Sequence, residues 1–297
     1  MVSRAEIGII GGSGLYHMPG LSNTREEQIS TPFGDPSDWL TFGELRGRKV
    51  AFLARHGRGH GILPSDINYR ANIYAMKQVG VSAILSISAV GSLKEGHAPG
   101  TFVVPDQFID RTYARRSTFF GPDLVAHVSM ADPVCPEVGN ALLAACEEHT
   151  VPAFRGGTYV CMEGPQFSTR AESNLYRSWG ADVIGMTNLQ EAKLAREAEI
   201  CYGTLAMVTD YDCWHSGHGA VTTDQILTVL NQNNARALKV LDGAVAALKA
   251  NRACGCQHAL KDAILTRPSL ISLATRQKLR LLLDRYIQPP PSLLEKQ

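Results

Sequence analysis

Apolar residues in this chain form short continuous runs that are separated by segments with helical spacing. Runs of about four to eight apolar residues bounded by turn residues predict buried strands. They lie at residues 7–10, 49–54, 83–92, 102–105, 157–162, 182–187 and 203–209. Apolar residues at helical spacing predict helices at 68–77, 137–148, 171–179, 191–199 and 222–245. Strands that alternate with helices favour an α/β fold, with a mixed, mostly parallel central sheet flanked by helices.

Two regions depart from this pattern. Residues 22–48 are polar and rich in turn residues, so no strand is predicted there. Beyond Asn251 the chain changes character: Pro268 precedes an amphipathic stretch at 279–287. No internal repeat stands out. We therefore expect a single domain, with its main part at 1–250 and a C-terminal helical extension of the same domain at 251–297.

Composition narrows the class of protein. The 297 residues are 44% hydrophobic and 19% charged, which suits a substantial core, and the formal net charge is +1. That charge gives no electrostatic reason to expect nucleic acid or an anionic membrane as a partner. No apolar run approaches the roughly 18 residues of a membrane helix, and the N-terminus lacks the build of a signal peptide. A cytoplasmic protein is expected.

The seven cysteines are scattered and have no framework spacing. Most are expected to be small buried thiols in a reducing compartment. The exception is the close pair Cys254 and Cys256, which could oxidise, so a disulfide and two free thiols are both open there.

The first two predicted strands end in loops that suit an anion. Ser13 lies in a glycine turn, Gly11-Gly12-Ser13-Gly14-Leu15, and glycines let the backbone approach a phosphate closely. His17 stands where a dinucleotide fingerprint needs glycine, and the Gly-Lys-Ser/Thr of a P-loop is missing. Taken by itself, the turn is also compatible with an ordinary strand-to-turn connection.

The second strand ends at Arg55-His56-Gly57-Arg58-Gly59-His60, a concentrated cationic loop. Arginine offers a planar fork for phosphate oxygens, and histidine can donate beside it. Metal binding by His56 and His60 is the competing interpretation, but the intervening glycines disfavour a helix and no local cysteine or carboxylate completes a site. The loop therefore favours an anion, and no metal site is predicted.

Later strands also end in polar residues. Ser88 and the backbone near Ala89 could donate to the same anion, as could Thr187, although small residues packed beneath a helix explain Ser88 equally well. Asp210 and Asp212 follow the strand at 203–209, and side chains two apart on a strand share a face. Such a pair could accept from amino groups, hold a proton or bind a cation; a simple turn is the plainer alternative.

Phe167, on a glycine-proline loop after another strand, could stack on a flat ring or belong to the core. Ligands of open α/β sheets bind beyond the carboxyl ends of the strands, where these loops would meet. A phosphate site beside a ring site suggests phosphorolysis of a nucleoside.

Seven motifs, in order over roughly residues 7–250, resemble those of the trimeric purine nucleoside phosphorylase family, and in particular of its members that act on S-methyl-5'-thioadenosine. They are Gly11-Gly12-Ser13-Gly14-Leu15, Arg55-His56-Gly57-Arg58, Ala89-Val90-Gly91-Ser92-Leu93, Asp106-Gln107-Phe108-Ile109-Asp110-Arg111-Thr112, Glu163-Gly164-Pro165-Gln166-Phe167-Ser168, Gly185-Met186-Thr187 and Thr209-Asp210-Tyr211-Asp212-Cys213-Trp214. The resemblance implies a single α/β domain whose sheet closes partly into a barrel, assembled as a homotrimer that could pair into a hexamer.

The resemblance also implies roles for individual residues. Phosphate would contact Ser13, Arg55, His56, Ser88, Ala89 and Thr187. Met186 would lie against the ribose, while Phe167, Ser168, Thr209, Asp210 and Asp212 would border the base. The methylthio group would lie among Val221, Ile226 and Leu227, with His127 supplied by a neighbouring subunit. The chain's C-terminal extension, with Cys254 and Cys256, departs from the animal-type members.

The implied reaction uses inorganic phosphate as a co-substrate and no cofactor. Asp210 is the expected general acid for the departing purine, provided that burial raises its pKa. Two carboxylates favour a 6-amino over a 6-oxo group, because a carboxylate only accepts hydrogen bonds. The nearest alternative is a 6-oxopurine nucleoside or methylthioinosine phosphorylase of the same fold. A nucleoside hydrolase would need an N-terminal aspartate cluster, and none precedes Asp35. A non-catalytic binding module is the remaining alternative.

Overall fold

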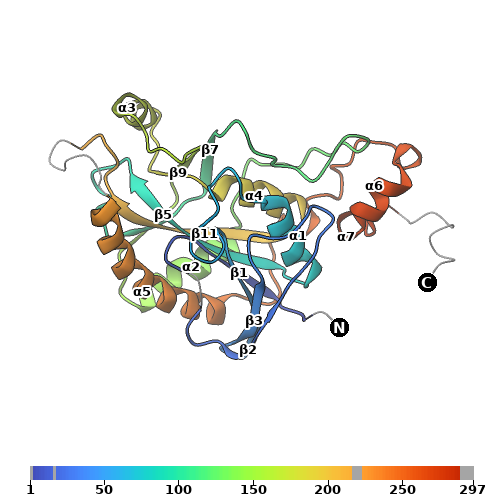
Figure 1. Ribbon diagram of the computed structural model, residues 1–297, viewed down its shortest axis with the longest axis horizontal. Helices are drawn as coiled ribbons and strands as arrows, with labels where there is room; N and C mark the ends of the chain where they lie inside the picture. The colour runs from blue at the N-terminus through green and yellow to red at the C-terminus, as the bar shows by residue number, and fades with distance from the viewer. Residues whose placement is uncertain (1–2, 16–17, 216–222, 288–297) are drawn as a thin grey trace.

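The computed structural model describes residues 3–15, 18–215 and 223–287. Its central feature is an eleven-stranded sheet with the order β2-β3-β4-β1-β5-β10-β9-β7, from which β11, β6 and β8 branch beside β5 (Figure 1). The strands are β1 Ile7–Gly11, β2 Ser22–Glu27, β3 Leu40–Leu45, β4 Arg48–Ala54, β5 Ala83–Ser92, β6 Phe102–Val104, β7 Gln107–Arg111, β8 Ala153–Arg155, β9 Thr158–Met162, β10 Val183–Gly185 and β11 Cys201–Asp210.

Helices cover both faces of this sheet. They are α1 Tyr69–Gln78, α2 Pro136–Glu148, α3 Arg170–Ser178, α4 Asn188–Glu197, α5 Thr223–Ala247, α6 Leu273–Lys278 and α7 Arg280–Leu283, with 3₁₀ turns η1 Gly255–His258 and η2 Pro268–Leu270. Figure 1 shows α1 and α4 on one side of the central strands and α2 and α5 on the other. The mixed α/β single-domain architecture predicted from the apolar pattern is confirmed.

Alternating side chains of the central strands fill two separate cores. Ile10 and Ile84 pack with residues of α1 and α4, whereas Ile9 and Leu85 pack with residues of α2 and α5. This alternation is the strand period of two, and burial on both faces explains why β1, β5 and β11 read as continuous apolar runs. The continuous runs therefore identify the centre of the sheet, which carries the site.

The strand pairings are mixed. Parallel pairs outnumber antiparallel ones by six to four. Among the described strands the pairings form a branched path without a closed ring. Partial closure into a barrel therefore stays a prediction.

The prediction that residues 22–48 hold no strand was wrong. β2 and β3 form an antiparallel pair there, and β3 continues onto β4. β2 is an edge strand with the sequence Ser-Asn-Thr-Arg-Glu-Glu, and it is exposed almost throughout. A polar edge strand has no apolar alternation to reveal it, and its charges disfavour pairing with other chains. The sequence pattern also missed β7 and β8, which are short or partly exposed.

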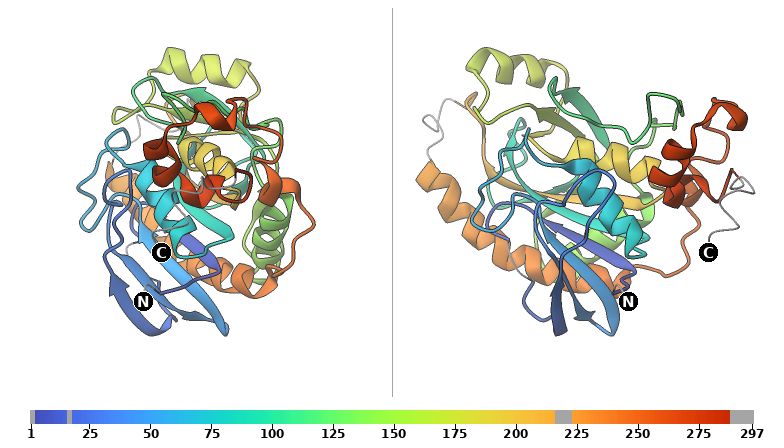
Figure 2. Two further views of the ribbon diagram at one scale, coloured as in Figure 1. Left: turned by 90° about the vertical axis from the view of Figure 1, so that its right-hand side faces the viewer. Right: turned by 45° about the vertical axis from the view of Figure 1, so that its right-hand side comes forward.

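The C-terminal segment, which the structure describes over residues 251–287, lies against the rest of the domain through a small apolar face. Leu279, Leu282, Leu283 and Ile287 pack into the same core as α1 and α4. Figure 2 shows α6 and α7 at one end of the molecule. The segment contains short helices, as expected, while the division into a part at 1–250 and an extension at 251–297 stays a prediction.

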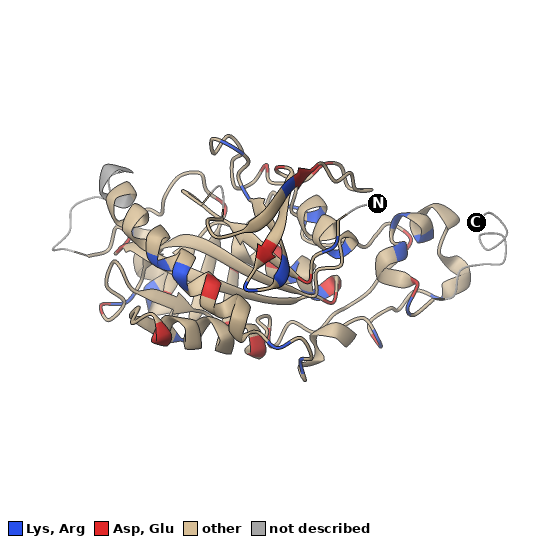
Figure 3. Cartoon of the chain, turned by 90° about the horizontal axis from the view of Figure 1, so that it is seen from below, with Lys and Arg blue, Asp and Glu red and all other residues tan. Residues whose placement is uncertain are grey.

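Positions of basic and acidic residues alternate along the elements seen in Figure 3, in agreement with the net charge of +1. None of the described helices combines the length and apolarity needed to traverse a bilayer.

Candidate active site

One cavity of about 310 Å³ lies where the ends of β1, β4, β5, β10 and β11 meet. It brings together residues that are far apart in the sequence, as expected for an α/β sheet. The predicted site residues that line it are Ser13, Arg55, His56, Ser88, Ala89, Phe167, Met186, Thr187, Thr209, Asp210 and Asp212. Phosphate-type and base-type residues therefore share one chamber.

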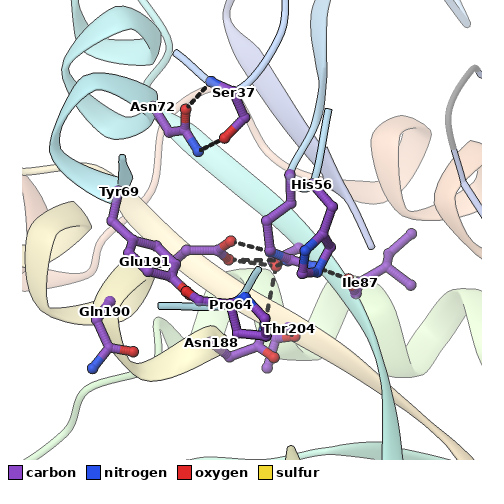
Figure 4. Close-up of polar contacts among 12 residues, drawn as sticks. Ser37, His56, Pro64, Tyr69, Asn72, Ile87, Asn188, Gln190, Glu191 and Thr204 are labelled. Atoms are coloured by element: carbon purple, nitrogen blue, oxygen red, sulfur yellow. Dashed lines mark hydrogen bonds and ion pairs between the residues drawn. The ribbon is translucent and has the colours of Figure 1, made fainter. Parts of the chain in front are cut away.

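Arg55 is held beneath this cavity by a buried ion pair that the sequence did not reveal. Its Nε and Nη2 donate to the two carboxylate oxygens of Glu191, and both side chains are 1% exposed. Figure 4 shows the polar contacts around the Glu191 carboxylate. Nη2 also donates to Ser86 Oγ at 2.7 Å, and Nη1 to the Ile87 carbonyl at 2.9 Å. Glu191 accepts two further bonds, from Ser86 Oγ at 2.7 Å and Tyr202 Oη at 2.8 Å. Glu191 Oε2 thus accepts three bonds and Oε1 one, and most N–H groups of Arg55 have a partner.

This network changes the predicted role of Arg55. The sequence suggested an open guanidinium fork for phosphate, but the fork is already bonded to Glu191. Burial works to lower the pKa of Arg55, and the adjacent Glu191 carboxylate outweighs it and raises that pKa further, so the cation persists. Gly12 keeps Nη1 accessible from the cavity side, because a Cβ there would lie 2.8 Å from that nitrogen. Arg55 can therefore offer an anion its remaining N–H rather than a bidentate clamp.

The histidines of the same loop are less cationic than the sequence suggested. His56 Nδ1 donates to the Ile62 carbonyl at 2.8 Å, which leaves Nε2 for a ligand. Burial, together with the charge of Arg55, lowers the pKa of His56 to about 4, and the pKa of His60 is lowered for the same reasons. The two rings stack at 4.2 Å. Arg58 lies outside the cavity and pairs with Glu26 at 2.7 Å. At neutral pH both histidines are therefore uncharged.

Uncharged hydrogen-bond donors line the end of the cavity where an anion would lie. Ser88 Oγ is buried and makes no hydrogen bond of good geometry among the described residues, although the Tyr159 hydroxyl lies near enough to interact with it. Thr187 is the N-cap of α4, its side chain makes no capping bond, and it lines the cavity. The N-terminus of a helix of this length favours negative charge through its free N–H groups and dipole. The cavity thus has a polar end built from hydroxyls, backbone dipoles and one compensated arginine.

The free hydroxyl of Ser88 gives a first prediction. Ser88→Ala removes a buried hydroxyl that makes no well-formed hydrogen bond to a described protein group, so folding stability should change by less than about 1 kcal/mol. The KM for phosphate should rise by roughly tenfold, as for loss of one hydrogen bond to a charged group. Steady-state kinetics with phosphate and nucleoside varied separately check this. A similar rise in the nucleoside KM would contradict a phosphate-specific role.

The two carboxylates at the other end of the cavity are arranged differently from the strand rule. β11 is bulged between Val208 and Asp210, and Asp212 lies past its end with a φ of 52°. The two acids therefore lie together in one cavity, as predicted, but strand alternation is not what places them there. Asp210 accepts from Thr209 Oγ1 and from the Asp212 N–H, each at 2.7 Å. Gly91 lies under the pair, since a Cβ there would lie 3.1 Å from Asp210 Oδ1.

Burial raises the pKa of both acids. For Asp210 the hydrogen bonds from Thr209 and Asp212 offset part of that effect. For Asp212, burial and the neighbouring Asp210 carboxylate outweigh its hydrogen bonds and bring the pKa to about 6. Asp212 Oδ2 is buried and makes no hydrogen bond of good geometry among the described residues, although the Ser173 and Ser168 hydroxyls lie near enough to lower the pKa of Asp212. The site therefore holds two acids that keep a proton to higher pH than free aspartate does, and Asp212 has an oxygen that could still accept from a ligand.

A pH-dependent stability difference follows from Asp212. The pKa of Asp212 is raised from its ordinary value of 3.8 to about 6 in the folded protein. The stability contributed by protonated Asp212 is therefore complete below pH 3.8 and is lost as the pH rises through 6. Asp212→Asn should therefore raise the free energy of unfolding by about 1–3 kcal/mol at about pH 8 and by much less at about pH 4. Denaturant titrations at the two pH values measure this. The matched control Asp110→Asn should be destabilised at pH 8, because the hydrogen-bonding partners Lys193 and Thr112 outweigh burial and lower the pKa of Asp110.

The apolar part of the cavity is held by a glycine-proline loop. Gly164 has a φ of 69°, and a Cβ there would lie 2.5 Å from Met186 Sδ, so glycine allows Met186 to lie across the loop. Phe167, on the same loop, is 59% exposed at the cavity. Ser168 is buried behind it, with its Oγ 3.7 Å from Met162 Sδ, and does not line the cavity.

Sequence reasoning also missed Arg115, which ties these loops together. It lies in a segment without regular structure, and its side chain is 1% exposed. Its guanidinium donates to the Met186 and Glu163 carbonyls and to Gln190 Oε1, and pairs with the Glu163 carboxylate at 3.2 Å. Glu163 in turn accepts from the Tyr113 N–H at 2.7 Å. No periodicity or motif around Arg115 signals this role.

Two further predicted residues, His127 and Leu227, do not line the cavity of the single chain. His127 is exposed on a loop, where its backbone N–H donates to the Ala263 carbonyl. Leu227 is 47% exposed and does not line the cavity, whereas Leu230, one turn further along α5, does. Val221 and the side chain of Ile226 lie outside the described residues. Roles for these four residues stay predictions.

One α/β cavity thus combines a polar end, two buried carboxylates and an apolar wall, which is the arrangement that a nucleoside-processing enzyme needs. The family model described as "Phosphorylase superfamily" matches residues 6–246, so the chain belongs to that superfamily.

Similar proteins cover nearly the whole chain. A protein of Koribacter versatilis named S-methyl-5'-thioadenosine phosphorylase is 62% identical, over 95% of this chain and 97% of its own. One of Geobacter sulfurreducens with the same name is 55% identical, over 95% and 99%. The structure of a methylthioadenosine phosphorylase from an antarctic soil metagenomic library superposes with a TM-score of 0.90 at 52% identity, covering 95% and 100%. That of Schistosoma mansoni methylthioadenosine phosphorylase in complex with adenine gives 0.81 at 37%, covering 87% and 96%.

Proposed function

We propose that this chain catalyses the phosphorolysis of S-methyl-5'-thioadenosine to adenine and 5-methylthioribose 1-phosphate. The observation that carries the proposal is the shared cavity, in which an anion end and two buried acids lie side by side. Relatives named S-methyl-5'-thioadenosine phosphorylase at 62% and 55% identity support the choice of substrate. Inorganic phosphate is the co-substrate, and no cofactor is invoked.

In this proposal phosphate lies at the anion end of the cavity. The Ser88 hydroxyl, the α4 N-terminus at Thr187 and the remaining N–H of Arg55 are available as donors. Ser13, the Ala89 backbone and Nε2 of His56 complete the contacts. Because His56 is neutral in the free protein, a phosphate dianion beside it would raise its pKa and favour a proton on Nε2.

The nucleoside occupies the other end. Met186 would lie against the ribose, and Phe167 and Ser168 beside the base. Thr209, Asp210 and Asp212 would face the edge of the adenine that carries N7 and the 6-amino group. Oδ2 of Asp212, which makes no hydrogen bond of good geometry among the described residues, is available to accept from that amino group. Phe167, exposed in the single chain, would lose that exposure against the ring.

The chemistry follows from these positions. As the bond between the ribose and purine N9 stretches, positive charge develops on the sugar, and a phosphate held beside it stabilises that charge before attacking C1'. The purine leaves as an anion unless N7 is protonated. Asp210, whose pKa is raised by burial, is the proposed general acid for that proton.

The methylthio group belongs at the start of α5, next to Leu230. Val221, Ile226 and Leu227 are the proposed contacts, with His127 from a neighbouring subunit. This arrangement needs a homotrimer, which could pair into a hexamer, and the exposed Phe167 and Tyr113 near the cavity are compatible with a subunit contact. Light scattering should give about three times the mass of one chain, or six times for the hexamer. A monomer would contradict the role of His127.

The deciding experiment is adenine release from methylthioadenosine with and without inorganic phosphate. Release only with phosphate, together with 5-methylthioribose 1-phosphate, is expected. Release without phosphate would indicate a hydrolase and overturn the anion site. Turnover of methylthioinosine in place of methylthioadenosine would instead show that the carboxylates do not select a 6-amino group.

A cytoplasmic location is also proposed. All seven cysteines are free thiols in the structure, including Cys254 and Cys256, which suits a reducing compartment.

A further inference from the structure

Four cysteine thiols meet at the end of β11 remote from the acids. Cys201 is the first residue of β11, Cys135 is the N-cap of α2, and Cys254 and Cys256 belong to the C-terminal segment. Their four sulfur atoms all lie within 4.8 Å of one another. Cys254 Sγ is 3.5 Å from Cys135 Sγ and 3.4 Å from Cys201 Sγ. The proposed catalytic site does not use this cluster.

Burial and charge around the cluster suit thiolates. Cys135, Cys201 and Cys256 are at most 4% exposed, and Cys254 is half-buried. Arg252 Nε lies 3.3 Å from Cys201 Sγ, and Arg196 Nη1 lies 3.8 Å from Cys256 Sγ. Arg252 is fixed in place by donating also to Ser82 Oγ at 2.7 Å. A zinc ion with four thiolates carries a net charge of about −2, which these two guanidinium groups would balance.

We propose that Cys135, Cys201, Cys254 and Cys256 form a tetrahedral zinc site. Zinc–sulfur bonds of about 2.3 Å place the sulfurs of a tetrahedral site roughly 3.8 Å apart, close to the sulfur–sulfur distances around Cys254. A disulfide joins each sulfur to one partner at about 2.05 Å. Cys254 instead approaches two partners equally closely, and mutual proximity of all four sulfurs is what a shared ion requires.

The cluster has an entry path and a structural consequence. A surface cavity of about 480 Å³ is lined by Cys135, Cys254 and Cys256 together with Arg196. The ion would join the start of β11 and the start of α2 to the C-terminal segment. β11 then runs for about 30 Å before it reaches Asp210, so the ion would act on the fold rather than on the reacting atoms.

Sequence spacing could not reveal this site. Cys254 and Cys256 flank a single glycine, which is closer than the usual spacing of zinc-binding cysteine pairs, and Cys135 and Cys201 are isolated in the sequence. The interpretation that no metal is bound considered only local spacing, whereas the four thiols come together through the fold.

The test is metal binding by the purified full-length chain, kept reduced and exchanged into ZnCl₂ and then desalted. About one zinc ion per chain is expected by elemental mass spectrometry. Replacement by Co²⁺ should give the thiolate charge-transfer and ligand-field absorption of tetrahedral cobalt. Less than about a tenth of an equivalent of zinc, or a cobalt spectrum without thiolate bands, would overturn the proposal. An intact mass lowered by two hydrogens per disulfide, with no metal retained, would overturn it too.

Two matched cysteine variants test whether the zinc ion is bound by this cluster. Cys254→Ser changes the half-buried member, so the chain should fold, and it should bind zinc at least tenfold more weakly. Cys146→Ala changes a buried cysteine of α2 outside the cluster and should retain stoichiometric zinc. Zinc should also raise the thermal midpoint of the unsubstituted chain and of Cys146→Ala, but not that of Cys254→Ser. Equal zinc content in the two variants would overturn the assignment to this cluster.

Discussion

Replacing Asp210 by asparagine is expected to lower kcat by roughly 10²–10³-fold while leaving the KM for phosphate nearly unchanged. Asparagine has the shape of aspartate but cannot give up a proton to N7. The local structure can accept it, because the amide oxygen can still accept from the Asp212 N–H. The Thr209 hydroxyl, which now donates to Asp210 Oδ2 at 2.7 Å, can instead accept from the amide nitrogen while donating to the Val90 carbonyl.

A second substrate separates proton donation from binding. An N7-methylated methylthioadenosine carries a positive base and leaves without protonation, so Asp210→Asn should slow it far less than the parent nucleoside. Steady-state kcat for both substrates, measured for the unsubstituted chain and the variant, gives the comparison. Equal losses on the two substrates would show that Asp210 binds the base without acting as an acid. Full turnover of the parent substrate by the variant would show that it does neither.

The meeting of Ser13, Ser88 and Thr187 in one cavity could be predicted, because each lies at or near the end of a strand that is recognisable in the sequence. Ser13, Ser88 and Thr187 follow or end apolar runs, and the carboxyl ends of the central strands meet in one place. Only chain order and strand polarity are needed for that conclusion. The local signal is strong because burial on both faces makes these strands continuous in apolar residues.

What could not be predicted depends on long-range partners. Glu191 lies 136 residues from Arg55, in the first turn of a helix where an acid is expected simply to favour the helix dipole. Arg115 acts through carbonyl oxygens, which any sequence supplies. Neither residue type nor spacing distinguishes these charges from exposed ones. The fold alone reveals that they are buried, and the charge of the predicted cationic loop was overestimated for the same reason.

The buried pair of Glu191 and Arg55 leads to the largest expected stability effect. Glu191→Gln keeps the size of the side chain but leaves the Arg55 cation, 1% exposed, without a counter-ion. Removing one partner of a buried ion pair costs about 3–5 kcal/mol, because the other charge stays desolvated. The amide nitrogen would also face groups that now donate to the carboxylate, such as Ser86 Oγ and Tyr202 Oη. Denaturant titration should show this loss.

The exposed pair on the same helix is the matched control for that measurement. Lys193 Nζ lies 2.6 Å from Asp110, with side chains 30% and 33% exposed, so Lys193→Met should cost less than about 1 kcal/mol. Phosphate provides a further readout, because a bound dianion would become the counter-ion of Arg55. Phosphate should therefore raise the thermal midpoint of Glu191→Gln more than that of the unsubstituted chain. If Glu191→Gln cost no more than Lys193→Met, Arg55 would have to find another counter-ion, and the picture of a compensated arginine beneath the phosphate site would be wrong.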